Sequence, residues 1–418
     1  MVLGLTTSET ASRGESTMSL VLTSGWHPAL HRAEINAALG RIDPDVDVKI
    51  LGPRCLHVET TLSDKELLAH LSLTAGMDML LVESGMCVGN ISQEDLIDRV
   101  TLSLVEQVRD DCRLRVDVER HRSMLSSFSR REIAKGVGAA ALAECSEITI
   151  DLTNPNCTIQ VILTAGFSAE PLVVWGRRLN SHPPRRGWNE RAPTRRPFFQ
   201  PIALDVRVAR SLIHLGASYL RSGESLCDPC SGTGGILIEA ALSGVPAVGV
   251  DLDPDMVRGS RENLRWIGAG DEQTCMFGDS THLSEVLASG GSDHEGRWPS
   301  PPPSVSPWPF PIGSLIFDPP YGRNAWTSEG PALTERVLTE AARWMRVGSG
   351  VLFLCAIEPD MIDTDHPLSL GDEGGLGDAL RRVAERIGSS GWNVTRGFGI
   401  HVHSSMSRLM VEAVLGER

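Results

Sequence analysis

The chain has 418 residues, of which 41% are hydrophobic and 22% are charged, and its formal net charge is −14. At roughly 100–200 residues per domain this length suggests two or three domains, and the composition excludes a wholly disordered protein. No uncharged apolar stretch reaches the roughly 18 residues that a transmembrane helix needs, and the N-terminus lacks the pattern of a secretory signal. We therefore expect neither a membrane protein nor a secreted one.

Cysteine usage indicates a reducing compartment. The nine cysteines are an odd number and are scattered from Cys55 to Cys355, which does not form a disulfide framework. Cys227 and Cys230 make one C-x-x-C pair, but no second pair of cysteines or histidines stands at the spacing of a zinc site. We predict a cytoplasmic protein without a metal site, in which this pair packs in a loop.

The first 175 residues have mixed helix and strand patterns. Residues 28–39 and 102–108 show the apolar spacing of helices. Three short β-branched runs between residues 148 and 175, separated by turn residues, predict three strands. The sequence therefore predicts an N-terminal α+β region over residues 1–175.

Residues 176–200 are rich in arginine and proline and predict an exposed, extended linker. Between Arg177 and Arg196 there are seven arginines and one acidic residue, Glu190, although the whole chain is acidic. Arginine suits phosphate binding and base stacking, and a chance cluster in an arginine-biased sequence is the alternative. The candidates for contacts with nucleic acid are Arg177, Arg178, Arg185, Arg186, Arg195 and Arg196.

Helical and strand patterns alternate over residues 201–418 and predict a parallel sheet covered by helices. A glycine- and proline-rich insert over residues 289–311 interrupts this half, and we predict a surface loop there with no assigned role. The second half is therefore expected to form a single α/β domain.

The strongest local signal is Ser225-Leu-Cys-Asp-Pro-Cys-Ser-Gly-Thr-Gly-Gly235, which predicts a strand, a tight glycine turn and a helix. Free amides at such a turn favour a nucleoside cofactor. The turn lacks Gly-Lys-Ser/Thr, which argues against an NTPase loop, and position 237 is leucine where a nicotinamide fingerprint needs a third glycine. The cofactor-binding candidates in the turn are Asp228, Pro229, Ser231, Gly232 and Gly234.

Acidic residues follow the next two predicted strands. Asp251 ends the strand after the turn, with Asp253 beyond it, and Asp279 and Ser280 end a later strand. A carboxylate at the end of the second strand can accept hydrogen bonds from ribose hydroxyls, and one farther on suits an adenine amine. Each acid alone could cap a helix, but in this order they predict a nucleoside pocket.

The predicted reactive element is Asp318-Pro319-Pro320-Tyr321, which follows a buried strand. An amine on an aromatic ring is a poor nucleophile because its lone pair is delocalised. Asp318 and the carbonyl of Pro319 can accept its two N–H bonds, and Tyr321 can stack on the base, as in base-flipping enzymes. The alternative is a loop stiffened by Pro319 and Pro320 with an incidental tyrosine.

These motifs resemble, in their order, those of class I S-adenosylmethionine-dependent amino-methyltransferases, and among them the archaeal tRNA guanine-N2 methyltransferase family acting on guanosine 10. Residues 191–199 are similar to the segment that leads into that family's catalytic domain, and residues 401–408 to its C-terminal signature. Residues 151–155 resemble the end of a THUMP domain, an RNA-binding module. The resemblance implies a Rossmann-like doubly wound sheet with a C-terminal antiparallel hairpin, preceded by an α+β region that contains a THUMP domain.

The resemblance also implies roles for residues. The methionine end of S-adenosylmethionine would lie against the 228–235 turn, its ribose on Asp251 and its adenine near Asp279. The target guanine of tRNA would lie between Asp318 and Tyr321. We expect a monomer that does not associate with a membrane. The sequence does not determine whether one or two methyl groups are added, or whether a partner subunit exists.

Other functions fit the same residues. The Asp318–Tyr321 motif alone would also fit an enzyme that methylates adenine in RNA or DNA, or guanine in ribosomal RNA. A glutamine side chain is less favoured, because relatives that modify glutamine carry asparagine in place of Asp318. A non-catalytic RNA-binding scaffold that kept the fold is the remaining alternative.

Overall fold

The computed structural model describes the chain from Thr17 to Glu417, except residues 108–110, 122–124, 180–186, 202, 292–303, 321–328, 358–361 and 404–405. The described residues form two compact units. The first takes in those of Met1–Pro28, Ile42–Ser72 and Gly76–Pro183, and the second those of Ala29–Arg41, Leu73–Ala75 and Pro184–Arg418. No helix in these described ranges is both long and apolar enough to span a membrane.

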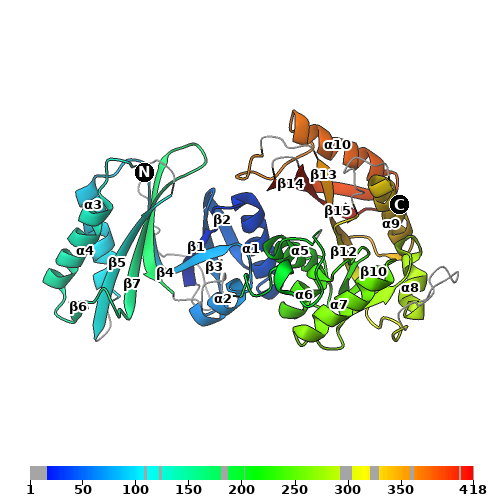
Figure 1. Ribbon diagram of the computed structural model, residues 1–418. Coiled ribbons are helices and arrows are strands. Elements are labelled where there is room, and N and C mark those ends of the chain that lie inside the picture. The colour runs from blue at the N-terminus through cyan, green and yellow to red at the C-terminus, as the bar shows by residue number, and fades with distance from the viewer. Residues whose placement is uncertain are drawn as a thin grey trace. The chain divides into compact units, whose positions relative to one another are not determined.

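In the first unit the described strands form an eight-stranded mixed sheet in the order β2-β3-β1-β4-β8-β7-β5-β6, and helices α3 and α4 pack beside each other (Figure 1). The three strands predicted between residues 148 and 175 are confirmed as β6, β7 and β8. The strands are β1 (Thr17–Thr23), β2 (Asp47–Gly52), β3 (Cys55–Thr60), β4 (Met77–Val88), β5 (Cys112–Arg120), β6 (Ile148–Ile150), β7 (Cys157–Ala165) and β8 (Pro171–Arg178), and the helices are α2 (Asp64–Leu71), α3 (Gln93–Val105) and α4 (Arg130–Glu144).

Serine caps decide where the two packed helices begin. The Ser92 side chain accepts a hydrogen bond from Asp95 N and starts α3, and Ser129 does the same for α4 through Glu132 N. The helix predicted at residues 102–108 therefore begins earlier, at Gln93, and ends at Val105. Apolar residues of both helices share one core with β5, β7 and β8.

The second unit has a seven-stranded sheet, counted over the described strands, in the order β11-β10-β9-β12-β13-β15-β14. The first five pair in parallel, and β14 and β15 form an antiparallel hairpin on β13. This is the predicted doubly wound sheet with a C-terminal hairpin. The strands are β9 (Ser225–Asp228), β10 (Ala247–Asp251), β11 (Gln273–Phe277), β12 (Ile312–Phe317), β13 (Gly350–Ile357), β14 (Trp392–His403) and β15 (Met406–Leu415).

Helices cover both faces of this second sheet (Figure 1). Alternate residues of β12 enter different cores: Ile316 joins the core under α5, α6 and α7, and Leu315 and Phe317 join the core under α8, α9 and α10. A strand buried on both sides reads as a continuous apolar run, which is why β12 was predictable. The helices are α5 (Val206–Ala217), α6 (Gly235–Leu242), α7 (Pro254–Trp266), α8 (Leu283–Ser289), α9 (Glu329–Trp344) and α10 (Gly375–Gly388).

A helix from the N-terminal part of the chain belongs to the second unit. Ala29 and Leu30 of α1 (Pro28–Ile42) share the core of α5 and α6. Glu34 on α1 is fully buried, and its carboxylate lies 2.8 Å from His214 Nδ1 on α5 and accepts a hydrogen bond from Ala75 N at 2.7 Å. The boundary proposed near residue 176 stays a prediction, and this grouping differs from it in residues 29–41 and 73–75.

The turn between β9 and α6 requires glycine. Gly234 has a φ of +76°, and a Cβ there would collide with the Ser260 side chain on α7. Gly244, after α6, also has a positive φ, +63°, but a Cβ there meets no atom within 4 Å. A substitution at Gly244 therefore measures the cost of a left-handed backbone alone, and one at Gly234 measures that cost together with the cost of a steric collision.

We expect Gly244→Ala to lower the free energy of unfolding by about 1–2 kcal/mol, the cost of a left-handed alanine. Gly234→Ala should lower it by about 1–3 kcal/mol more, because Ser260 must also move. Urea denaturation of both variants measures the difference. Equal losses would mean that the turn relaxes freely around the added carbon.

Candidate active site

A cavity of about 370 Å³ lies where the sheet of the second unit reverses its order, with β10 and β12 on either side of β9. Parallel strands bring their carboxyl ends to the same edge, so residues that follow these strands meet there. The structure brings most of the predicted residues together: the cavity is lined by Asp228, Pro229, Ser231, Gly232, Asp251, Asp253, Asp279, Ser280, Asp318 and Pro320.

Backbone hydrogen bonds hold the glycine turn against β10. Ser231 N donates to Val250 O at 3.0 Å, and Gly232 N donates to Asp251 Oδ2 at 2.7 Å. The other oxygen of Asp251 accepts from Asp253 N at 2.9 Å. Burial raises the pKa of the Asp251 carboxyl, and these two amide bonds oppose the shift. The Asp251 carboxylate at the end of β10 is thus fixed in one orientation at the cavity wall.

The cavity is strongly acidic. Five carboxylates line it, and no lysine or arginine does so among the residues that the structure describes. Burial raises the pKa of the Asp228 carboxyl well above its ordinary range; a hydrogen bond from Cys230 N opposes this, and the charges of Asp251 and Asp318 add to it. Such a cavity attracts a cation, so its donor set fits a sulfonium cofactor better than a phosphate.

Asp279 lies on the side of the cavity next to β11. Its side chain accepts hydrogen bonds from Thr281 N at 2.9 Å and Thr281 Oγ1 at 2.8 Å, at the start of the short 3-10 helix η2 (Ser280–His282). Burial would raise the pKa of this carboxyl, but the bonds from Thr281 hold it below its ordinary value. Ser280 Oγ donates to Pro229 O, which ties η2 to the glycine turn.

Asp318 follows the last residue of β12 and faces the same cavity as the glycine turn. Arg408 Nη2 from β15 lies 3.0 Å from Asp318 Oδ2. Pro320 lines the cavity, whereas Pro319 is buried beside it. Tyr321 lies outside the described residues, so its place next to Asp318 stays a prediction.

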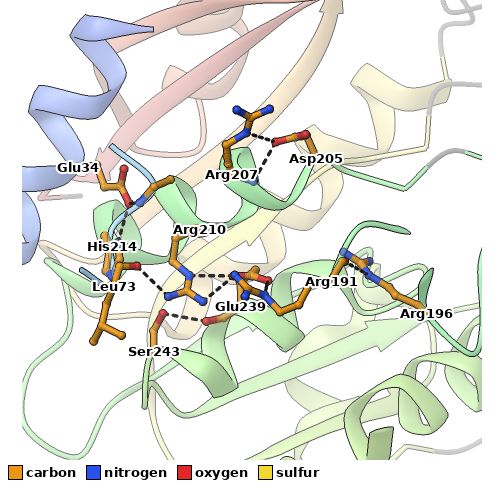
Figure 2. Close-up of polar contacts among 11 residues, drawn as sticks. Glu34, Leu73, Arg191, Arg196, Asp205, Arg207, Arg210, His214, Glu239 and Ser243 are labelled. Atoms are coloured by element: carbon orange, nitrogen blue, oxygen red, sulfur yellow. Dashed lines mark hydrogen bonds and ion pairs between the residues drawn. The ribbon is translucent and has the colours of Figure 1, made fainter. Parts of the chain in front are cut away.

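The segment after residue 187 is anchored to α6 (Figure 2), and the prediction of an exposed, extended linker is wrong there. Trp188 is only 8% exposed, and the guanidinium groups of Arg191 and Arg210 lie 4.7 and 5.7 Å from its ring. Both arginines pair with the fully buried Glu239 on α6, at 3.0 and 2.6 Å. Composition predicted exposure because it could not show that a buried carboxylate partners these arginines.

The predicted RNA-binding arginines occupy different environments. Arg177 Nη2 donates to Glu83 Oε1 at 2.7 Å, and Arg196 is 5% exposed with Nε donating to Arg191 O at 3.1 Å. Arg178 is half-buried, and Arg195 is exposed at the end of η1 (Pro193–Arg195). Arg185 and Arg186 lie outside the described residues. The side chains of Arg177 and Arg196 are therefore engaged within the protein itself.

Two family comparisons agree with this geometry. Residues 193–292 match the family described as RMKL-like, methyltransferase domain, and residues 92–167 match the THUMP domain family. The first match contains the glycine turn together with Asp251 and Asp279, and the second covers the helices and strands from α3 to β7.

Similar whole proteins point the same way. The tRNA (guanine(10)-N2)-dimethyltransferase of Methanothermobacter thermautotrophicus is 27% identical over 85% of this chain and 91% of that protein. The protein of that name from Pyrococcus abyssi is 39% identical over 28% of this chain and 34% of its own length. These matches support the resemblance to the archaeal tRNA (guanine(10)-N2)-methyltransferase family. The crystal structure of TrmN from Thermus thermophilus, 18% identical, covers 95% of this chain and 100% of its own with a TM-score of 0.51, and it shows a shared fold.

Sequence reasoning missed several residues that line the cavity. Leu252 and Met256 follow β10, and the sequence could have predicted them as an apolar wall beside Asp251. Leu204, before α5, and Ile236 and Leu333, on helices, gave no signal, because an apolar residue usually packs in a core. These residues supply the apolar part of the cavity lining.

Glu239→Gln should lower the free energy of unfolding by about 3–5 kcal/mol, because it leaves the buried cations Arg191 and Arg210 without their counter-ion. The matched control is Glu335→Gln, whose pair with Arg386 is solvent-exposed and should contribute at most about 1 kcal/mol. Chemical denaturation measures both variants. Similar small losses would show that Glu239 does not hold the 188–196 segment on α6.

Proposed function

We propose that this chain transfers methyl groups from S-adenosylmethionine to the exocyclic N2 amine of guanosine 10 in tRNA. The observation that carries the proposal is the shared cavity, in which Asp318 faces the glycine turn and the acids of β10 and β11. Similarity to proteins named tRNA (guanine(10)-N2)-dimethyltransferase supports the same substrate.

The cofactor roles follow from the walls of the cavity. The turn from Asp228 to Gly235 would hold the methionine end, Asp251 the ribose hydroxyls, and Asp279 the adenine amine, with Leu252 and Met256 against the adenine faces. The negative charge of the cavity favours a sulfonium. When bound, S-adenosylmethionine supplies a methyl group: a bond from the amine nitrogen to the methyl carbon forms while the carbon–sulfur bond breaks, its electron pair stays on sulfur, and the nitrogen releases a proton.

The protein's part in the reaction is to position the amine. Asp318 and the carbonyl oxygen of Pro319 accept the two N–H bonds, which turns the nitrogen lone pair toward the methyl group. Asp318 or water takes the released proton, and a carboxylate of ordinary basicity suffices. Tyr321 would stack on the guanine after the base has left its helix.

The tRNA would be held mainly outside the catalytic cavity. The THUMP domain match at residues 92–167 provides an RNA-binding module. Arg195 is exposed and so available to phosphates, as Arg178 is in part, whereas Arg177 and Arg196 are bonded inside the protein. A monomer in the cytoplasm, where tRNA is modified, is the state that we propose.

Asp318→Ala should keep cofactor binding but lower methyl transfer by about 100-fold or more, because the amine is no longer positioned. Asp271→Ala, an exposed carboxylate before β11, is the control and should stay at the wild-type rate. The measurement is mass-spectrometric nucleoside analysis of tRNA incubated with isotope-labelled cofactor.

Three outcomes would contradict the proposal when the wild-type protein is incubated in parallel with tRNA and with ribosomal RNA. Methylated adenosine would favour an adenine methyltransferase, labelled ribosomal RNA but not tRNA would favour another guanine substrate, and no labelled nucleoside would favour the scaffold alternative. N2-methylguanosine and N2,N2-dimethylguanosine both support it, and their ratio gives the number of methyl groups added.

Arg195→Ala should weaken tRNA binding and lower the slope of log affinity against log salt concentration by about one, because one phosphate contact is lost. Arg382→Ala removes an equally exposed arginine from α10 and should leave the slope unchanged. Filter binding at several salt concentrations measures both. An unchanged slope for Arg195→Ala would exclude this arginine from the RNA interface.

A further inference from the structure

Asp318 is held by a basic residue from a distant part of the chain. Arg408 Nη2 lies 3.0 Å from Asp318 Oδ2, and the two side chains are only 12% and 14% exposed. Solvent and salt screen a pair this shielded much less than a surface pair. The pair therefore has the burial needed to hold the carboxylate in a defined orientation.

The strand arrangement explains how residues 90 positions apart meet. β12 ends at Phe317, and β13 separates it from β15. Because β15 runs antiparallel to β13, its first residues lie beside the last residues of β13, and Arg408 is in register with Ala356. The Arg408 side chain thus crosses the carboxyl end of β13 to reach the residue that follows β12.

The charges around Asp318 make a counter-ion necessary. Asp228 and Asp251 line the same cavity, and no lysine or arginine lines it among the described residues. Like charges in a partly dehydrated site disfavour the ionised form of each carboxyl group. A protonated Asp318 would present an O–H donor and would be a weaker acceptor of an N–H bond than the carboxylate.

We propose that Arg408 is a positioning residue that keeps Asp318 ionised and fixes the plane of its carboxylate, so that the carboxylate accepts an N2–H bond of the guanine. This assignment rests on the proposed function, and Arg408 itself does not touch the methyl group. A carboxylate oxygen accepts more than one hydrogen bond, so the ion pair leaves the acceptor role intact. The planar fork of arginine also orients a carboxylate in a way that a lysine ammonium does not.

The test compares full-length Arg408→Ala and Arg408→Lys with the wild type in single-turnover methylation of tRNA. Arg408→Ala should lower the methyl-transfer rate by about 10- to 100-fold, and Arg408→Lys by less, because it restores charge without the fork. Cofactor affinity by calorimetry and tRNA affinity should change by less than about twofold, since neither depends on the orientation of Asp318. Low millimolar guanidinium chloride should partly restore Arg408→Ala.

Two further variants separate positioning from a structural role. Arg396→Ala removes another arginine–carboxylate pair of the same hairpin, with Glu412, and should keep the methyl-transfer rate if it stays folded. In an Asp318→Asn background, Arg408→Ala should cause little further loss, because the carboxylate that it positions is already gone.

The outcomes are distinct. A wild-type rate in Arg408→Ala would overturn the assignment while leaving the proposed function in place. Equal losses in Arg408→Ala and Arg396→Ala, with a lower melting temperature and no effect of guanidinium, would show a structural role and also overturn it. A wild-type protein that methylates no guanosine would remove the proposed function and this assignment together.

Discussion

The concentration of negative charge at one edge of a parallel sheet is the constraint on which the site depends. Five carboxylates face a single cavity, and burial disfavours the charged forms of Asp228, Asp251 and Asp279. Backbone amides oppose this effect in part at Asp228 and Asp251, hydrogen bonds from Thr281 outweigh it at Asp279, and Arg408 pairs with Asp318. The result is a rigid anionic surface that suits a positively charged methyl donor.

A second electrostatic cluster is centred on Glu239 of α6. Arg191 and Arg210 share the buried Glu239 (Figure 2). Trp188 packs against both arginines. Asn263 of α7 extends this anchoring, since its side chain bonds the backbone of Phe198 and of Thr233. The segment that precedes the catalytic sheet is therefore connected to the glycine turn through Asn263.

The arginines of residues 177–196 occupy two kinds of environment. Arg177, Arg191 and Arg196 are engaged inside the protein, although all three fall in the stretch whose composition suggested RNA contact. Arg195 in the same stretch is exposed. A count of basic residues measures the charge of a segment but cannot separate arginines that bind phosphate from those that neutralise buried carboxylates, because burial is a property of the folded chain.

The sequence by itself determined the doubly wound sheet, the glycine turn and the order of the acids, because strand and helix periodicity and the position of a residue at a strand end are local properties. It also placed Asp318 in the site, since Asp318 directly follows a buried strand and is itself followed by two prolines, which cannot continue the strand. Tertiary structure alone decided that α1 belongs to the catalytic unit, that residues 188–196 pack on α6, and that Arg408 reaches Asp318. Each of these depends on contacts between residues far apart in the chain, and such contacts leave no local pattern to detect.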